Sequence, residues 1–217
     1  MSVLSLQDMA PGFSDSTAQS QAVFRSALDA MARPGTPIAI PSASLVSPTP
    51  GTHAAAASLL LALLDQDCAL WLSPTLANGP AAAWLRFHTG CQMVQDCSKA
   101  DFVWAASIAE LPPLHQLKQG SAEYPDQSAT CVLDVTTWRA AAEAGADAVS
   151  LRGPGVRDVL TLALDGMDAN FVQQHHAMQE HAPCGVDMFF CAGDAVLGFP
   201  RSVRLQMRGG VGSQTCT

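Results

Sequence analysis

The chain has 217 residues, of which 48% are hydrophobic and 14% are charged. This balance is typical of one compact domain with a sizeable core, and it excludes a wholly disordered chain. The formal net charge of −8 argues against non-specific attraction to nucleic acid or to an anionic membrane surface.

The cysteines indicate a reducing environment. There are seven of them, an odd number, and no two form a Cys-x-x-Cys pair. Several stand inside apolar runs, where a free cysteine behaves as a small hydrophobic residue. Residues 1–13 lack the features of a secretory signal, and the apolar run 54–64 is too short to cross a bilayer. We therefore expect a soluble, cytoplasmic protein.

Helices and strands are predicted to alternate through the first part of the chain. Residues 14–35 predict a helix, because polar capping residues open it, apolar residues recur at helical spacing and Pro34-Gly35 ends it. Two further helices are predicted, a largely apolar one at 52–67 and one at 78–90. Strands are predicted at 36–41, 68–73, 101–107 and 129–135.

The second part of the chain is predicted to be less regular. Its expected elements, in order, are a short helix at 110–120, a loop at 121–128, a short helix or an insertion at 136–147, a strand at 156–165, a helix at 166–181, a hairpin at 185–200 and a fraying tail from 207. The pattern favours a single α/β domain with a mixed sheet. We take 1–217 as that domain, with 1–15 and 206–217 poorly ordered.

The segment "LRGPGVRD" at 151–158 raises the question of a phosphate-binding loop. Such a loop needs a helix directly after the glycines, or a lysine beside Ser or Thr. Here a predicted strand follows Gly155, and the lysine is missing. We interpret the segment as a tight turn in which Gly153 and Gly155 supply unusual backbone angles.

The other candidates for chemistry are weak. His175, His176 and His181 stand on one predicted helix and raise the question of a metal site. Their spacing does not place them on one face of the helix, so a solvent-exposed polar surface is the better interpretation. Only two lysines are present, Lys99 and Lys118, both in polar segments, so a Schiff-base lysine is not expected. We expect no metal, no cofactor and no catalytic residue.

Arginines at the ends of predicted elements are the remaining candidates. Arg33, Arg86 and Arg201 could bind phosphate or phosphonate oxygens with their planar guanidinium groups. They could equally satisfy helix carbonyls or pair with carboxylates. One hypothesis is a cleft formed by Arg86, His88 and Arg201 in a free-standing enzyme or small-anion-binding protein.

Several segments resemble one protein family. They are "FRSALDAMARPGTPIAI" at 24–40, "LWLSPTLANGPAAAWLRFHTGC" at 70–91 and "PCGVDMFFCAGDAVLGFPRSVRL" at 183–205, and "LRGPGV" at 151–156 also fits. The order and spacing of these segments are similar to those of the H subunit of bacterial carbon–phosphorus lyase systems, the PhnH family. One departure is Ser202-Val203, where the family has Thr-Thr after the arginine.

The resemblance carries expectations about fold and function. It implies a three-layer αβα sandwich like that of pyridoxal-phosphate-dependent transferases, without the cofactor. It implies a homodimer that joins the G, I and J subunits of the core complex, a ribose 1-methylphosphonate 5-triphosphate synthase. That complex transfers alkylphosphonate to the ribose C1′ of ATP and releases adenine.

Within that complex the expected role is structural, with no independent activity. The side chains offered as ligand-binding residues are Arg86, His88 and Arg201. The turns expected to shape the fold lie at Gly153, Gly155 and Gly185.

Overall fold

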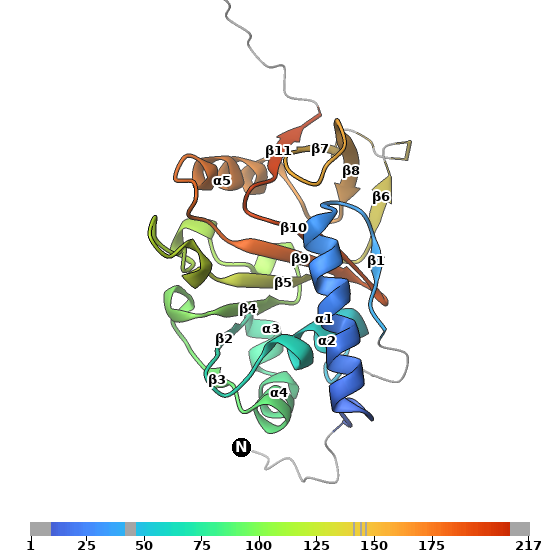
Figure 1. The fold of residues 1–217 in the computed structure, drawn as a ribbon, viewed down its shortest axis with the longest axis vertical. Coiled ribbons are helices and arrows are strands. Elements are labelled where there is room, and N and C mark those ends of the chain that lie inside the picture. Colours follow the sequence, from blue (N-terminus) through green and yellow to red (C-terminus); the bar gives the residue numbers. More distant parts are fainter. Residues whose placement is uncertain (1–9, 42–46, 141, 144, 146, 209–217) are drawn as a thin grey trace, which may run out of the picture.

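The structure is a computed structural model that describes residues 10–41, 47–140, 142–143, 145 and 147–208. Its centre is a mixed sheet of seven strands in the order β1-β10-β9-β5-β4-β2-β3 (Figure 1). The strands β9, β5, β4, β2 and β3 run parallel, whereas β10 and β1 are antiparallel to their neighbours. Their bounds are β1 Ile38–Ala39, β2 Ala69–Leu72, β3 Gln92–Met93, β4 Phe102–Ala105, β5 Thr130–Asp134, β9 Asp187–Ala192 and β10 Ala195–Phe199.

Helices cover one face of this sheet (Figure 1). The helix α1 begins after Asp15, whose side chain caps it by accepting a hydrogen bond from the Ala18 amide. The helix α4 ends at Gly90, which has the left-handed conformation typical of a C-terminal glycine. The bounds are α1 Ser16–Ala32, α2 Ala54–Leu63, α3 Pro74–Ala77 and α4 Ala81–Thr89.

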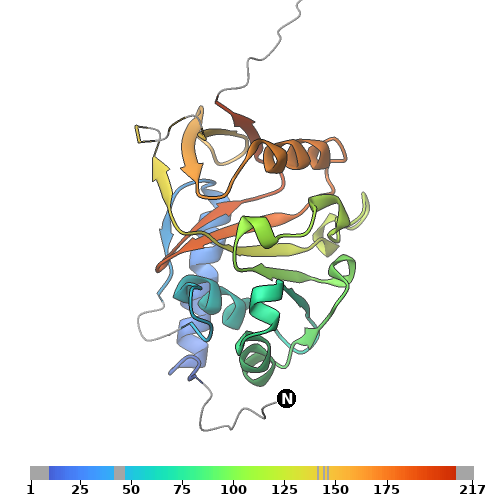
Figure 2. The ribbon, with the colours of Figure 1, turned by 180° about the vertical axis from the view of Figure 1, so that it is seen from behind.

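The opposite face carries a different layer (Figure 2). It contains the helix α5 (Ala169–Gln179), short 3₁₀ turns and a second, antiparallel sheet in the order β11-β7-β8-β6. The expectation of a three-layer αβα sandwich is therefore wrong for the third layer, which contains a four-stranded sheet as well as one helix. The bounds of the second sheet are β6 Trp138–Ala140, β7 Val149–Arg152, β8 Leu160–Leu164 and β11 Arg204–Met207.

Alternating side chains of the central strands fill two cores. In β9, Met188 and Phe190 face the core shared with α5 and the second sheet. Phe189 and Cys191, the residues between and after them, face the core under α1, α2 and α4. Both faces of the sheet are thus buried, which explains why its strands read as continuous apolar runs rather than as an alternating pattern.

The predicted helices at 14–35, 52–67, 78–90 and 166–181 and the hairpin at 185–200 are confirmed. The prediction of a short helix at 110–120 is wrong, since this stretch forms only isolated 3₁₀ turns. The prediction for 136–147 is also wrong, because its first part is strand β6, paired with β8. The prediction of a poorly ordered tail from residue 206 is wrong for residues 206 and 207, because they belong to strand β11. Residues 209–217 lie outside the described part of the chain.

The glycines of 151–158 are explained by packing. Gly155 has φ +80°, and a Cβ atom there would lie 2.4 Å from the carbonyl oxygen of Ala32 at the end of α1. Gly153 has φ +142°, and a Cβ atom would lie 3.0 Å from the carbonyl oxygen of Ser202. The turn therefore lets β7 and β8 approach α1 and the start of β11 closely. Among the described residues, no helix is both long enough and apolar enough to span a membrane.

Candidate functional site

A small cavity lies where the parallel strands β4 and β5 end. Its volume is about 230 Å³. In open α/β sheets, ligands bind beyond the carboxyl ends of the parallel strands, so this is the position at which the fold favours a site. The polar side chains that line it are those of His53, Ser107, Asp134, Thr136 and Asp165.

Asp134 is the buried carboxylate at this edge. Its Oδ2 accepts a 2.7 Å hydrogen bond from the indole Nε1–H of Trp104, and its Oδ1 accepts a 2.7 Å bond from the backbone N–H of His53. Burial raises the pKa of Asp134 to about 6, although both hydrogen bonds act in the opposite direction. The carboxylate thus ties the start of α2 to the end of β5.

His53 completes this connection. It is the residue before α2, and its ring Nε2 lies 2.9 Å from the carbonyl oxygen of Val135. Since both oxygens of Asp134 and one ring nitrogen of His53 have protein partners, these two side chains position the edge of the cavity. The hydroxyls of Ser107 and Thr136 and the carboxylate of Asp165 are the groups left to meet a ligand, a set that suits hydroxyl groups rather than an anion.

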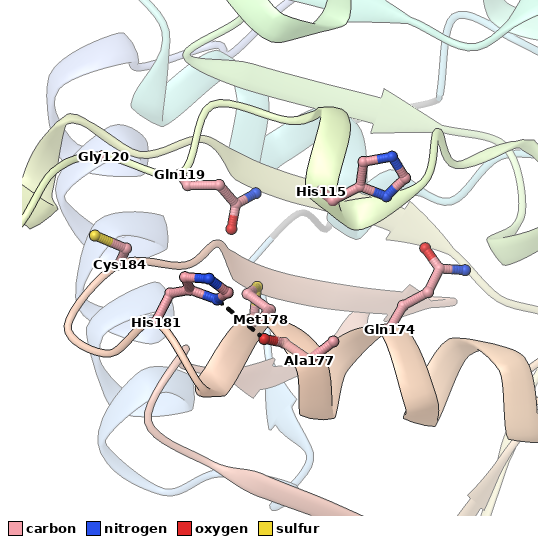
Figure 3. Close-up of a pocket in the computed structure, with 8 residues that line it drawn as sticks. All are labelled: His115, Gln119, Gly120, Gln174, Ala177, Met178, His181 and Cys184. Carbon is pink, nitrogen blue, oxygen red and sulfur yellow. Dashed lines mark hydrogen bonds between the residues drawn. The ribbon is translucent and has the colours of Figure 1, made fainter.

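A second cavity, of about 430 Å³, separates α5 from the loop before β5 (Figure 3). Gln119 is held on one wall, because its Nε2 donates to the carbonyl oxygens of Leu114 at 2.6 Å and Leu117 at 3.0 Å. His181 on the opposite wall has its Nδ1 3.3 Å from the carbonyl oxygen of Ala177. None of the eight lining residues is Asp, Glu, Lys or Arg, so this cavity suits an uncharged ligand.

The three histidines near the end of α5 do not meet. His175 is fully buried, and neither of its ring nitrogens has a hydrogen-bond partner among the described residues. His176 and His181 are exposed. Within the described part of the chain, no group of three or more His, Cys, Asp or Glu side chains could hold a metal ion. Burial, together with the nearby His176, lowers the pKa of His175 to about 4.

The structure does not bring Arg86, His88 and Arg201 together. Arg86 and His88 lie on α4, which packs beside β3 at one edge of the central sheet, and Arg201 follows β10 near the other edge (Figure 1). His88 has its Nε2 3.2 Å from the carbonyl oxygen of Ala10. Arg86 is exposed.

Arg201 is already bound within the chain. Its Nε and Nη2 donate to the two carboxylate oxygens of Asp187 at 3.2 and 2.5 Å, and its Nη1 donates to the carbonyl oxygen of Pro125. The turn at Gly185, with φ +143°, lies against the same side chain: a Cβ atom at this position would be 3.2 Å from the Arg201 Cβ. This arginine therefore fastens the β9–β10 hairpin to the loop before β5.

Three of the segments that resembled one family lie in contact in this fold, because the helix α1 packs on β10 and β7 pairs with β11. The fourth, 70–91, meets them through α2, which contacts both α4 and α1. The family model described as "Bacterial phosphonate metabolism protein (PhnH)" matches residues 11–206. The chain belongs to this family.

Two curated relatives agree with the PhnH family match. The chain is 34% identical over 194 residues to "Alpha-D-ribose 1-methylphosphonate 5-triphosphate synthase subunit PhnH" of Rhizobium meliloti (strain 1021). That alignment covers 89% of this chain and 94% of the relative. It is 27% identical over 189 residues to "Putative C-P lyase subunit protein HtxG" of Stutzerimonas stutzeri, covering 87% of each.

The two lysines of this PhnH-family chain do not fit a Schiff-base role. Lys99 lies 3.8 Å from Asp96 with most of its side chain exposed, and Lys118 pairs with Asp101 at 2.7 Å. Neither lines a cavity described above. Sequence reasoning missed Asp134, although a signal for it was present: an aspartate directly after the apolar core of a predicted strand marks the carboxyl end of that strand.

Proposed function

We propose that this chain is a subunit of a carbon–phosphorus lyase core complex in alkylphosphonate catabolism. In that role it supports the transfer of alkylphosphonate to the ribose C1′ of ATP with release of adenine, in the cytoplasm. The observation that carries the proposal is the PhnH family match over residues 11–206, to which the relative named as a synthase subunit adds 34% identity.

The positions of the candidate residues support a structural rather than a catalytic role. Asp134 and His53 form hydrogen bonds to other parts of the chain, and Arg201 forms an ion pair with Asp187. We therefore assign the transfer chemistry to the partner subunits G, I and J. We also propose that the fold is that of pyridoxal-phosphate-dependent transferases without the cofactor, which is supported by the positions of Lys99 and Lys118.

The outer face of α1 supports association with another subunit, including a second copy of this chain. Phe24 and Leu28 are 48% and 55% exposed and stand four residues apart, so they are neighbours on the helix surface. Large apolar side chains exposed side by side mark interaction sites more often than scattered ones do. Arg25 stands beside them on the same exposed face.

The decisive experiment is light scattering of the chain alone and after co-expression with the G, I and J subunits. We expect a homodimer alone and a larger stable particle with the partners. A chain that never enters a common particle would refute the proposal. The double variant Phe24→Ser/Leu28→Ser should lose association, whereas Gln21→Ser on the same exposed side of α1 should not.

A further inference from the structure

Two arginines face each other across the second sheet. Arg204 of β11 is the register partner of Arg152 of β7 in an antiparallel pair. Both side chains are exposed, while Leu205 and Leu151, the next register pair, are buried in the core shared with α5. The arginines therefore lie on the outer surface of this sheet, because successive strand residues alternate between its faces.

More arginines surround this pair. Arg208 follows β11 and extends its ladder, with its N–H bonded to the carbonyl oxygen of Ala148 at 2.8 Å. Arg157 lies in the loop that joins β7 to β8, and both it and Arg208 are exposed. We call Arg152, Arg157, Arg204 and Arg208 the arginine face. It holds four of the nine arginines of a chain whose net charge is −8.

Nothing in the described part of the chain neutralises this face. The ion pairs found there involve Arg33, Lys99, Lys118, Arg139 and Arg201, and none of the four arginines. Asp158, next to Arg157, is exposed and forms no ion pair among the described residues. Like charges directly opposite each other destabilise a strand pair, so this arrangement weakens the isolated fold.

The shape of the face indicates the kind of anion it fits. From Arg204 to Arg208 the charges extend over four residues of strand, roughly 13 Å, which is more than one phosphate spans. No cavity described for this chain is lined by any of the four residues. The chain's net charge of −8 opposes the dense charge of nucleic acid.

We propose that the arginine face docks against a carboxylate-rich surface of a protein partner. Opposed guanidinium groups can each form two parallel hydrogen bonds with a carboxylate, so such a surface would relieve the repulsion between Arg152 and Arg204. The inference goes beyond the proposed function by giving the chemistry of one partner surface. Its test uses no other subunit, so its outcome does not depend on whether the larger complex forms.

The test is fluorescence anisotropy of a labelled deca-glutamate peptide with the full chain, at about 20 mM and about 200 mM salt. The wild-type chain should bind at low salt and lose binding at high salt. Arg204→Glu should weaken binding of the peptide about tenfold, for two reasons. It removes one arginine, and the new carboxylate can pair with Arg152 on the neighbouring strand, so that Arg152 is no longer free to bind the peptide. Arg204→Lys keeps the charge but not the two parallel hydrogen bonds, so it should bind more weakly than the wild type and more tightly than Arg204→Glu.

Arg86→Glu is the matched control, because it changes net charge equally at an exposed arginine on α4, outside the arginine face. Equal weakening by Arg86→Glu and Arg204→Glu would overturn the proposal, as would absence of binding at low salt. Inorganic tripolyphosphate that binds more tightly than the peptide, and depends equally on Arg204, would assign the face to a small polyphosphate instead and would also overturn it.

Stability provides an independent readout. Glu at position 204 stands opposite Arg152, so Arg204→Glu should raise the urea midpoint of the isolated chain while it weakens peptide binding. A lower urea midpoint together with weaker binding would indicate a damaged sheet. The same two measurements on Arg152→Glu, which places the carboxylate opposite Arg204 instead, would then test the proposal. Loss of both properties in both variants would refute the opposed-charge argument.

Discussion

The indole N–H of Trp104 donates a 2.7 Å hydrogen bond to the carboxylate of Asp134, and both side chains are buried. Trp104 belongs to β4 and Asp134 ends β5, so the bond joins two parallel strands at their carboxyl edge. Because the backbone N–H of His53 binds the other carboxylate oxygen, one aspartate connects two strands and the start of α2. The expected consequence is a pH-dependent stability.

Asp134→Asn should remove a stability change between pH 7 and pH 4. In the folded protein the pKa of Asp134 is raised to about 6 from 3.8. The folded state therefore takes up a proton that the unfolded state does not, and Asp134 stabilises the fold increasingly as pH falls through 6 towards 4. The contribution is about 3 kcal/mol, since one pKa unit corresponds to about 1.4 kcal/mol. Urea denaturation at several pH values measures it.

At pH 7 the same variant should be close to the wild type in stability, because two effects oppose each other. An amide offers one acceptor oxygen, so either the Trp104 or the His53 N–H would lose its partner, at a cost of about 1–3 kcal/mol. The neutral amide also removes the cost of about 3 kcal/mol that burial places on the ionised carboxylate at this pH. Asp165→Asn, an exposed carboxylate at the same cavity, is the control. An unchanged pH profile in Asp134→Asn would contradict the assignment.

His175→Phe should act in the opposite direction. The pKa of His175 is lowered to about 4 from 6.5, so the unfolded state takes up the proton first and stability falls as pH drops from 6.5 towards 4. The loss is about 3 kcal/mol. Phenylalanine removes this loss together with two buried nitrogens that have no partner in the described residues. The variant should therefore be more stable at pH 5.

The two contributions oppose each other below pH 6. The wild-type profile should therefore be flatter there than that of either single variant. Asp134→Asn should become less stable as the pH falls, and His175→Phe should become more stable. His115→Gln, which changes an exposed histidine, serves as the control. Two falling profiles would contradict the assignment of Asp134, and two rising profiles would contradict that of His175.

The sequence predicted the elements that local patterns define. Helix α1 has a capping aspartate and a Pro-Gly end, and β5 is an apolar run, so both were found from residue order alone. The stretch 136–147 was not, because alanine favours helix locally and β6 forms only by pairing Trp138–Ala140 with β8. The 3₁₀ turns of 110–120 likewise depend on tertiary contacts, such as the hydrogen bond that the Leu114 N–H donates to the side-chain oxygen of Gln174 on α5.

The sites were harder to predict, because they depend on contacts between distant residues. Arg201 was offered as a ligand-binding residue, but its partner Asp187 lies across the β9–β10 hairpin and is recognisable only once the register is known. Asp134 meets His53 over 81 residues of sequence. The opposition of Arg152 and Arg204 is a property of strand register, which composition does not reveal.

Gly155→Ala should destabilise the fold through a close approach of two backbone segments. A Cβ atom would lie 2.4 Å from the Ala32 carbonyl oxygen, at φ +80°. We expect a loss of about 2–4 kcal/mol, or a fall of roughly 4–16 °C in Tm. Gly51→Ala is the control, since Gly51 has φ +86° but nothing within 4 Å. It should cost only about 1–2 kcal/mol, the strain of the left-handed backbone alone. Equal losses would show that packing at Gly155 is unimportant.

Arg201→Met should lower the free energy of unfolding by the contribution of the Arg201 side-chain contacts with Asp187 and Pro125. The substitution keeps much of the aliphatic side chain but removes the paired hydrogen bonds to Asp187 and the bond to Pro125. Because this pair is only about a quarter exposed, with side-chain exposures of 21% and 26%, we expect a loss of about 1–3 kcal/mol. Arg33→Met removes an ion pair with Asp29 whose side chains are 53% and 46% exposed, and it should cost under about 0.5 kcal/mol.

A double-mutant cycle with Asp187→Asn separates the contribution of the Arg201–Asp187 pair from that of the Arg201 bond to Pro125. If Arg201 acts mainly through Asp187, the double variant should lose clearly less than the sum of the two single variants. Additive losses would mean that the contact with Pro125 dominates. Saturable phosphonate binding by the wild-type chain that disappears in Arg201→Met but persists in Asp187→Asn would instead restore the ligand-binding role for this arginine. Chemical denaturation and calorimetric titration of the same four proteins decide between these outcomes.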